Sequence, residues 1–318
     1  MFAYVHDWDP VIFDIWRGIK LRWYGLSYLM AFVAAYYLLT HLSRKNLWVV
    51  AEKQIGDFIA LLAMLGVFVG GRLGYVLFYM LPKEGLELLK SDPMSVLRVW
   101  DGGMSSHGGF LGVAIFTYFY ARKHRISWTG IGDGVCIVAP LGLFFGRMAN
   151  FINGELYGRV APELAWGVKF PQALYTESYA VQESIVTECA DRAPQFADMA
   201  STPLGLSEAV RLSPEVRAIA EQYLTARHPS QLYEGVLEGL LIFSVMWFLR
   251  FRFPRAPHGM ICGIFFIMYG ALRIVAEHFR EPDSAMIGIF TKGQFYSLFM
   301  VLAGVAFLWQ LPRDQRRE

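Results

Sequence analysis

The chain has 318 residues, of which 55% are hydrophobic, 16% aromatic and 18% charged. This composition excludes an ordinary soluble globular protein and predicts a polytopic membrane protein. The formal net charge of +2 says little about partners, and no nucleic acid is expected among them. The three cysteines lack the spacing of a metal or redox motif, so neither a disulfide framework nor a metal site is predicted. The N-terminus lacks the basic start and cleavage site of a signal peptide, and we expect it to be retained.

Apolar runs that can cross about 30 Å at 1.5 Å per residue predict the membrane-spanning helices. The clear runs lie near residues 23–41, 55–80, 131–151, 232–249, 259–278 and 294–311. A further run near 107–121 is short and glycine-rich at its start, so its hydropathy alone is ambiguous.

Charge resolves the ambiguity, because short connections rich in Lys and Arg stay cytoplasmic. Basic clusters follow the first, third and fifth runs and close the chain when 107–121 is counted; they begin at Arg44, Arg122, Arg250 and Arg313. We therefore predict an all-α polytopic membrane protein with seven transmembrane helices. Its N-terminus is expected in the periplasm and its C-terminus in the cytoplasm.

The longest connection changes composition to Pro, Glu, Ser, Thr and Ala with scattered charge. We predict that residues 159–231 form a small periplasmic cap inserted between the fourth and fifth helices of a single transmembrane domain, 1–318. Segment 206–224 is predicted to be helical, with Ser213 as an N-cap before Pro214.

The fourth span ends unusually, in Gly146-Arg-Met-Ala-Asn-Phe-Ile-Asn-Gly-Glu-Leu-Tyr-Gly158. Arg147 and Asn150 lie three apart, on one helical face. A charge at the edge of hydrocarbon is costly unless it faces protein, water or a ligand, so this stretch is a functional-site hypothesis. The alternative is a snorkelling arginine at the interface, followed by a glycine-rich exit turn.

Polar residues of at least five spans lie at their outward ends in the predicted orientation. They are Tyr24, Arg72, His107, Arg147, Asn150, Glu155, His228, Gln231, Glu234, Arg273, Glu277 and Arg280. Snorkelling alone would distribute such groups over both interfaces. Their convergence predicts a site at the outer leaflet.

The outward arginines indicate an anionic ligand. Arg273, Glu277 and Arg280 fall on one stripe of a helix, where the carboxylate can hold the arginines in place; a structural ion-pair ladder is the alternative. Gly70-Gly71-Arg72 permits close approach of a neighbouring helix, and packing alone is its alternative explanation. Arginines that share a cavity repel each other unless an anion joins them, and guanidinium groups bind phosphate in a bidentate manner. A phospholipid headgroup is the natural candidate.

Two histidines each open a helix. His107 lies in Ser105-Ser106-His107-Gly108-Gly109, and an imidazole titrating near 6.5 could serve as a base there, although a structural role is equally open. His228-Pro-Ser-Gln-Leu-Tyr-Glu234 supplies groups for chemistry or for capping.

The fourth-span stretch resembles the signature of the bacterial prolipoprotein diacylglyceryl transferases and matches it at every defined position. The other motifs are similar to those of the family and occur in its order: Arg22-Trp-Tyr-Gly25, Gly70-Gly-Arg-Leu-Gly74, the His107-Gly-Gly stretch, His228-Pro-Ser-Gln-Leu-Tyr-Glu234 and Arg280-Glu-Pro-Asp283. The resemblance extends from about Tyr24 to Asp283, except for residues 160–227, which match no family motif.

The resemblance implies a seven-helix enzyme of the bacterial inner membrane, with its active site toward the periplasm. Such an enzyme moves the diacylglyceryl group of phosphatidylglycerol onto the lipobox cysteine thiol of a preprolipoprotein and releases glycerol phosphate. No cofactor or metal is expected. Arg147 and Arg273 correspond to the family's essential arginines. Its other sensitive positions correspond to Tyr24, His107, Asn150, Glu155, Gly158 and Glu277.

The chemistry of the residues agrees with this implication. A thiol with a pKa of about 8.5 must lose its proton before it attacks carbon, and the departing phosphate gains charge. We expect Arg147 and Arg273 to bind the phosphate. The further predicted substrate-binding residues are Arg72, Asn150, Glu155, Gly158, Glu277 and Arg280. His107 is the first choice of base, and Tyr24 is its rival.

Two other classes of membrane protein remain as alternatives. A lipid or anionic-solute transporter also uses intramembrane arginines, but it predicts polar groups near the midplane and often repeated halves, whereas this chain shows a one-sided cluster. An intramembrane protease could use Asp57 and Asp133, although helix capping explains both more simply.

Overall fold

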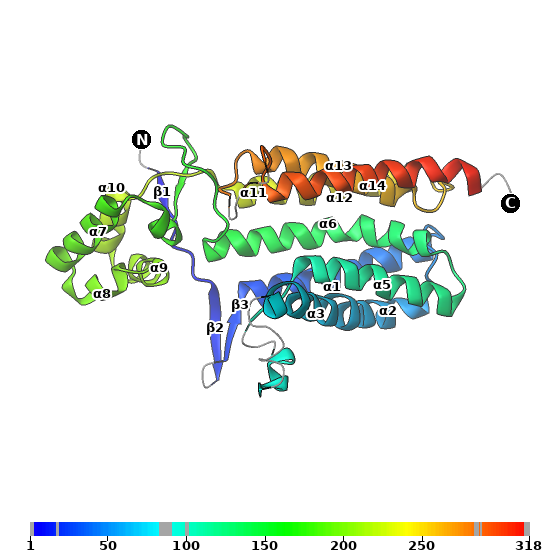
Figure 1. The fold of residues 1–318 in the computed structure, drawn as a ribbon, viewed down its shortest axis with the longest axis horizontal. Coiled ribbons are helices and arrows are strands. Elements are labelled where there is room, and N and C mark those ends of the chain that lie inside the picture. Colours follow the sequence, from blue (N-terminus) through cyan, green and yellow to red (C-terminus); the bar gives the residue numbers. More distant parts are fainter. Residues whose placement is uncertain are drawn as a thin grey trace. The chain divides into compact units, whose positions relative to one another are not determined.

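The computed structural model describes residues 3–16, 19–82, 91–98, 102–282, 286 and 288–314, and helices dominate them (Figure 1). Six helical segments are long and apolar enough to cross a membrane, judged by length and composition: Trp23–Arg44, Glu52–Met80, Trp128–Asn153, Ser230–Arg252, Met260–Glu277 and Lys292–Leu311. The six clear runs of the sequence are therefore confirmed as helices.

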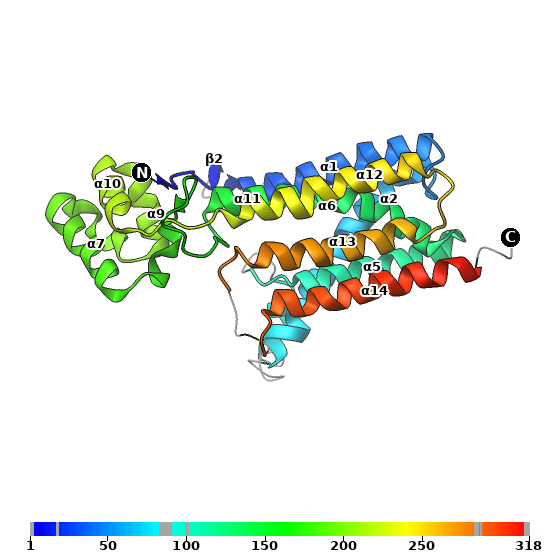
Figure 2. The ribbon, with the colours of Figure 1, turned by 90° about the horizontal axis from the view of Figure 1, so that it is seen from above.

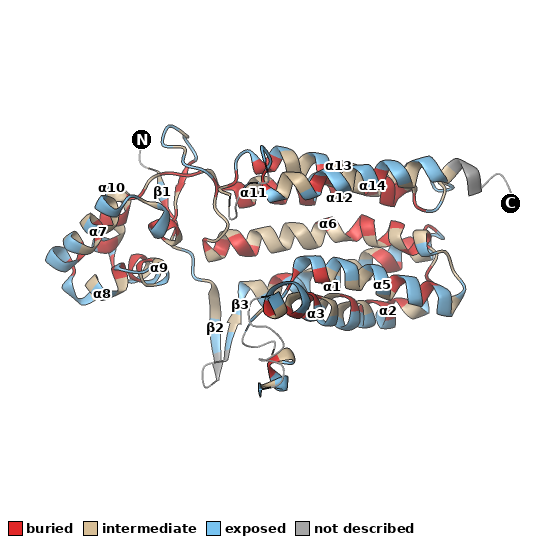
Figure 3. Cartoon of the chain, viewed as in Figure 1, coloured by how far each residue is buried: buried red, intermediate tan, exposed pale blue. Residues whose placement is uncertain are grey.

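The surface of these helices is apolar. Tyr37, Phe248 and Leu302 are each more than 60% exposed, and many other large apolar side chains of the spans are exposed as well (Figure 3). Water disfavours such surface, whereas lipid tolerates it. The chain is accordingly a multi-pass membrane protein.

The chain divides into two compact units. The first unit contains Met1–Ala31, Pro140–Val245 and Ile264–Ala306. The second unit contains Phe32–Ala139, Met246–Gly263 and Phe307–Glu318. Several long helices contribute to both, namely α1 (Trp23–Arg44), α6 (Trp128–Asn153), α13 (Met260–Glu277) and α14 (Lys292–Asp314).

Residues 171–223 of the first unit form a group of short helices (Figure 1). These are α7 (Tyr179–Arg192), α8 (Ala197–Ala200), α9 (Pro203–Leu212) and α10 (Pro214–Tyr223), preceded by the 3-10 helix Pro171–Thr176. They share an apolar core that includes Leu174, Ile185, Leu206 and Ile219. Val5, from the N-terminal segment, belongs to the same core.

The predicted helix at 206–224 is present but is divided in two. Ser213 is extended (φ −134°, ψ 120°) and its Oγ accepts a hydrogen bond from the Val216 amide, so it caps α10 as predicted. Pro214 causes the division, because a proline disfavours helical geometry at the residue before it.

Short strands correct the all-α prediction. Strand β1 (Tyr4–Val5) pairs in parallel with β4 (Val168–Lys169), and β2 (Val11–Trp16) pairs antiparallel with β3 (Ile19–Arg22). The β1–β4 pairing ties the start of the chain to a segment more than 160 residues later, a long-range contact that local sequence patterns do not reveal.

In the second unit, α5 (Ser106–His124) packs against the helical segment Glu52–Met80 through facing glycines. A Cβ atom added at Gly70 would lie 2.8 Å from the Gly108 oxygen, and one at Gly74 would lie 2.4 Å from the Gly108 Cα. The close approach predicted at Gly70-Gly71 is thus confirmed. Helix α5 covers the predicted 107–121 run, but it is not among the six segments that meet the length and hydropathy requirements.

The helical segment Ser230–Arg252 begins with α11 (Ser230–Glu234), continues through the π-helical turns Gly235–Leu241 and ends as α12 (Ile242–Arg252); its residues 230–245 belong to the first unit. Helix α14 packs on α13, where a Cβ atom at Gly270 would lie 2.7 Å from the Ser297 oxygen (Figure 2). The carboxyl-terminal ends of α6 and α13 and the start of α11 hold the candidate site.

Candidate active site

Arg147 and Arg273 share the same two carboxylates. The Arg147 Nε lies 2.8 Å from Glu234 Oε2, and its Nη2 lies 3.4 Å from Glu238 Oε2. The Arg273 Nη1 lies 3.3 Å from Glu234 Oε1 and 3.4 Å from Glu238 Oε1. The two arginines, from α6 and α13, are therefore bridged twice by carboxylates of one helical segment.

Glycines bring these carboxylates to α6. The sequence Glu234-Gly235-Val-Leu-Glu238-Gly239 repeats an acid–glycine pair after four residues. A Cβ atom at Gly239 would lie 2.6 Å from that of Phe144, and one at Gly235 would lie 2.8 Å from the Met148 Cε. The sequence analysis did not select Glu238. Two carboxylates four residues apart inside an apolar run were the pattern that could have indicated it.

The predicted stripe on α13 needs a correction. Arg273 Nη2 does pair with Glu277 Oε2 at 2.6 Å, as the i, i+4 spacing indicated. Helix α13 ends at Glu277, however, and Arg280 lies beyond it, with its Nη1 3.3 Å from Glu234 Oε1. Glu277 therefore pairs with Arg273, whereas Arg280 pairs with Glu234.

The network is electrically balanced by the protein itself. Three arginines (Arg147, Arg273, Arg280) meet three carboxylates (Glu234, Glu238, Glu277). The arginines therefore need no external anion to offset their mutual repulsion, as the ion-pair alternative indicated. Access is uneven, because the side chains of Arg147 and Arg273 are 17% and 13% exposed, whereas those of Glu234 and Glu238 are 1% and 0% exposed. A ligand that approaches the network meets the guanidinium groups first.

The signature stretch forms the turn that ends α6. Gly154 adopts φ +70°, its amide donates to the Phe151 carbonyl and the next amide, of Glu155, donates to the Asn150 carbonyl. This is the Schellman pattern, which favours glycine at the left-handed position. The Glu155 carboxylate turns back and accepts hydrogen bonds from the side-chain amides of Asn150 (2.8 Å) and Asn153 (3.3 Å). Asn150 and Glu155 therefore stabilise the turn together.

Gly158 lies where no side chain fits. Its amide donates to the His228 carbonyl, and an added Cβ atom would lie 2.5 Å from both the His228 and the Phe279 carbonyl oxygens. The buried Arg227 donates to the Gly158 carbonyl at 3.3 Å. The last residues of the signature stretch therefore pass between the start of α11 and the segment that follows α13.

The His228 motif also holds the signature stretch. Ser230 Oγ donates to the Leu156 carbonyl, and Gln231 Nε2 donates to the Glu155 carbonyl at 2.7 Å. Pro229 is the N-cap residue of α11 and immediately precedes its first residue. The side chains that were candidates for capping α11 therefore bind the neighbouring turn.

The two candidate bases lie in different units. Tyr24, in the first unit, is half-buried, and its ring centroid lies 5.5 Å from that of Tyr28. His107, in the second unit, is exposed on the first turn of α5, which Ser105 caps by accepting from the Gly108 amide. The choice between them stays a prediction.

Arg72, also in the second unit, binds main-chain oxygens. Its guanidinium donates to the carbonyls of Ser95, Val96, Gly102 and Gly103, at 2.5 to 2.9 Å. Its side chain is buried and lies over the ring of Tyr75. This bonding favours a loop-supporting role over the predicted contact with a lipid headgroup.

Other predicted groups have structural partners. Asp133 accepts hydrogen bonds from the Gly259 and Cys262 amides and so caps α13, and Asp57 lies in the first turn of α2 (Ile55–Leu61), as the capping interpretation predicted. Asp283 lies outside the described residues. Within the described residues, no group of three or more His, Cys, Asp and Glu side chains could hold a metal ion.

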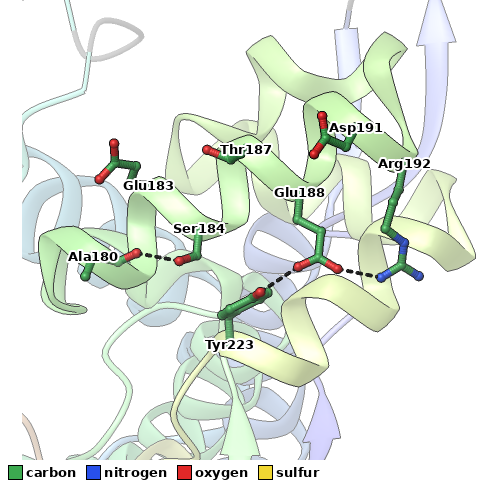
Figure 4. A pocket seen from close by; sticks show the side chains of 8 residues that line it. All are labelled: Ala180, Glu183, Ser184, Thr187, Glu188, Asp191, Arg192 and Tyr223. Carbon is green, nitrogen blue, oxygen red and sulfur yellow. Dashed lines mark hydrogen bonds and ion pairs between the residues drawn. The ribbon is translucent and has the colours of Figure 1, made fainter.

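An open pocket on the helical group lies apart from these residues in the sequence. Side chains of α7 and α10 line it, among them Glu188, which accepts hydrogen bonds from Arg192 Nη1 (2.9 Å) and the Tyr223 hydroxyl (2.6 Å) (Figure 4). It contains none of the predicted site residues.

Comparison with known proteins gives a consistent result. A family model described as prolipoprotein diacylglyceryl transferase matches residues 10–310. A protein of Bdellovibrio bacteriovorus named phosphatidylglycerol--prolipoprotein diacylglyceryl transferase is 40% identical to this chain. The alignment covers 96% of this chain and 93% of that protein. A protein of the same name from Serratia proteamaculans is 38% identical, over 98% of this chain and 96% of that protein. Another, from Escherichia coli O1:K1 / APEC, is 36% identical, over 99% of this chain and 98% of that protein.

Proposed function

Because the chain belongs to the prolipoprotein diacylglyceryl transferase family, we propose that it transfers the diacylglyceryl group of phosphatidylglycerol to a lipobox cysteine of a preprolipoprotein. The reaction forms a thioether and releases glycerol phosphate. One observation supports this function above all others. Arg147 and Arg273 are paired side by side at the partly exposed edge of a buried ionic network, where a lipid phosphate can reach them.

The arginines act on the leaving group. The cysteine sulfur forms a bond to the glycerol carbon, the bond from that carbon to the phosphate oxygen breaks, and both electrons of the broken bond go to the phosphate. Negative charge on the phosphate therefore increases along the reaction. Guanidinium groups that are already fixed by Glu234 and Glu238 stabilise this charge without having to reorganise.

The other predicted residues have supporting roles. Asn150 and Glu155 hold the turn at the end of α6, Gly158 allows the chain to pass between two carbonyls, and Glu277 orients Arg273. Arg280 offsets part of the negative charge of Glu234. Arg72 supports a loop of the second unit.

His107 is the proposed base for the thiol proton, with Tyr24 as the competing candidate. Because an imidazole accepts a proton near neutral pH, His107→Gln should lower kcat by about a hundredfold. Near-normal turnover of that purified variant would transfer the role to Tyr24.

The proposed topology has α5 as a seventh span, the N-terminus in the periplasm and the C-terminus in the cytoplasm of the inner membrane. Residues 159–231 then form a periplasmic cap within one transmembrane domain. A Glu183→Cys variant should react with a membrane-impermeant maleimide in intact cells, whereas Arg122→Cys should react only after lysis. The reverse pattern would contradict this orientation.

Mass spectrometry tests the activity. The purified chain is incubated with phosphatidylglycerol and a lipobox peptide, and the peptide should gain the mass of a diacylglyceryl group. A peptide in which serine replaces cysteine is the control and should stay unmodified. No adduct with the native chain, together with movement of labelled lipid across vesicles, would instead support a lipid transporter.

A further inference from the structure

The substrate and the product of the proposed reaction differ in charge at the position where the arginines act. The phosphodiester of phosphatidylglycerol has one negative charge. A phosphate monoester has a second pKa near 6, so glycerol phosphate approaches two negative charges at pH 7. An uncompensated pair of guanidinium groups would therefore bind the product more tightly than the substrate. Turnover requires something that weakens the product complex.

The carboxylates that face Arg147 and Arg273 can supply this weakening. Glu238 is fully buried, and it bridges Nη2 of Arg147 and Nη1 of Arg273. Both of its contacts are 3.4 Å long. Glu234 is bound more tightly, at 2.8 Å to Arg147, and it is also paired with Arg280. Glu238 is therefore the more weakly held partner of the two arginines.

The main chain that carries Glu238 lies close against α6. Gly239 packs against Phe144 of α6 so closely that an added Cβ atom would lie 2.6 Å from the Phe144 Cβ. The main chain of Glu238 is therefore held against α6, and its fully buried carboxylate stays near Arg147 and Arg273 even when a bound phosphate lengthens its contacts with them. Its negative charge remains beside the bound phosphate, and it repels a dianion more than a monoanion.

Given the diacylglyceryl transfer proposed above, on which this step rests, we propose that Glu238 is a product-release residue. Its carboxylate competes with the phosphate for the guanidinium groups of Arg147 and Arg273 and limits their affinity for the dianionic product. It touches no reacting atom and acts only through the two arginines.

The test measures product inhibition in the peptide assay. Two soluble inhibitors are compared: glycerol 1-phosphate, a near-dianion, and glycerophosphoglycerol, a monoanionic diester. The native chain should bind both with inhibition constants within about threefold of each other. Glu238→Gln keeps the shape but removes the charge, so it should bind glycerol 1-phosphate about tenfold more tightly while its constant for the diester changes much less.

The time course of the reaction should also show slower product release in the Glu238→Gln variant. Because release becomes slow in Glu238→Gln, a first turnover near the native rate should precede a slower steady state, with kcat lowered and KM not raised. Glu238→Asp, which restores the charge, should restore the native inhibition constants. Glu188→Gln removes a carboxylate of the α7 pocket that also pairs with an arginine, and it should change none of these values.

Two results would overturn the role of Glu238. One is a folded Glu238→Gln variant whose inhibition constant for glycerol 1-phosphate equals the native value. The other needs no variant: a native chain that already binds the monoester more than about tenfold more tightly than the diester. If the native chain forms no peptide adduct at all, the proposed function itself fails, and that outcome is distinct from both.

Discussion

Two glycine–arginine pairs in apolar helices have opposite environments. Arg147, after Gly146, is paired with carboxylates of another helical segment and keeps 17% of its side chain exposed. Arg72, after Gly71, is buried and donates to main-chain carbonyls of one loop. Carboxylate partners can be exchanged for a phosphate, whereas main-chain carbonyls are fixed and cannot follow a ligand. The acceptors around an intramembrane arginine therefore distinguish a ligand-binding role from a loop-supporting one.

The largest effect is expected at the exchangeable arginines. Arg147→Ala and Arg273→Ala should each lower adduct formation by about a thousandfold, because each removes a charged donor to the leaving phosphate. The rate per folded protein is measured by mass spectrometry, with Arg192→Ala in α7 as the control. A tenfold loss or less for both variants would remove the distinction between Arg147 and Arg72.

The next effect concerns two glycines of the signature stretch. Gly158→Ala should lower activity by tenfold or more, because the new methyl group would lie 2.5 Å from two carbonyl oxygens and displace the turn. Gly146 has no atom within 4 Å of an added Cβ, so Gly146→Ala is the matched control and should be nearly neutral. Equal losses of activity in the two variants would show that Gly158 is not required to preserve the turn.

A smaller and different effect is expected at Arg72. Arg72→Met leaves several buried carbonyls without donors and should destabilise the protein by roughly 3 kcal/mol, measured by thermal or denaturant unfolding in detergent. Turnover per folded molecule should stay within about threefold of the native value. A large fall in turnover without loss of stability would return Arg72 to the lipid-binding role that its sequence position suggested.

The smallest effect is a pH dependence at the N-terminal segment. Burial lowers the pKa of His6 from 6.5 to about 4, and Arg211 adds to the lowering, whereas the Phe151 main chain and Asp7 oppose it. Between these two values the unfolded chain binds a proton that the folded chain does not. Stability should therefore fall as pH drops from about 6.5 to 4, by up to roughly 3 kcal/mol.

His6→Phe tests this assignment, because it keeps a ring against Phe170 and Phe151 but removes the titrating group. The difference in unfolding temperature between native and variant chains should change over that pH interval. A constant difference would assign the acid sensitivity to other groups.

Local features of the sequence predicted most of the helices and the centre of the site. The apolar runs gave the six spans, and the Ser213-Pro214 pair marked the start of α10, because both depend on neighbouring residues only. Arg147 was found because a charge in an apolar run is costly. These are local rules, and they identified which residues are unusual.

What those residues contact depended on distant segments. Arg72 donates to carbonyls 23 to 31 residues later, and Glu238 meets Arg147 across 91 residues of sequence, so neither pairing was visible. The β1–β4 pairing was missed for the same reason. The i, i+4 spacing predicted Glu277 as a partner of Arg273, but no local pattern showed that Glu234 and Glu238 also pair with the arginines.

Arg147 and Arg273 are proposed to bind the lipid phosphate jointly, and a single structure can decide this. The joint binding is tested most directly by a structure of the native chain with phosphatidylglycerol bound. Phosphate oxygens should lie at about 2.8 Å from guanidinium nitrogens of both arginines, with the contacts to Glu238 lengthened. A phosphate bound elsewhere, with both arginines still bridged by Glu234 and Glu238, would contradict it.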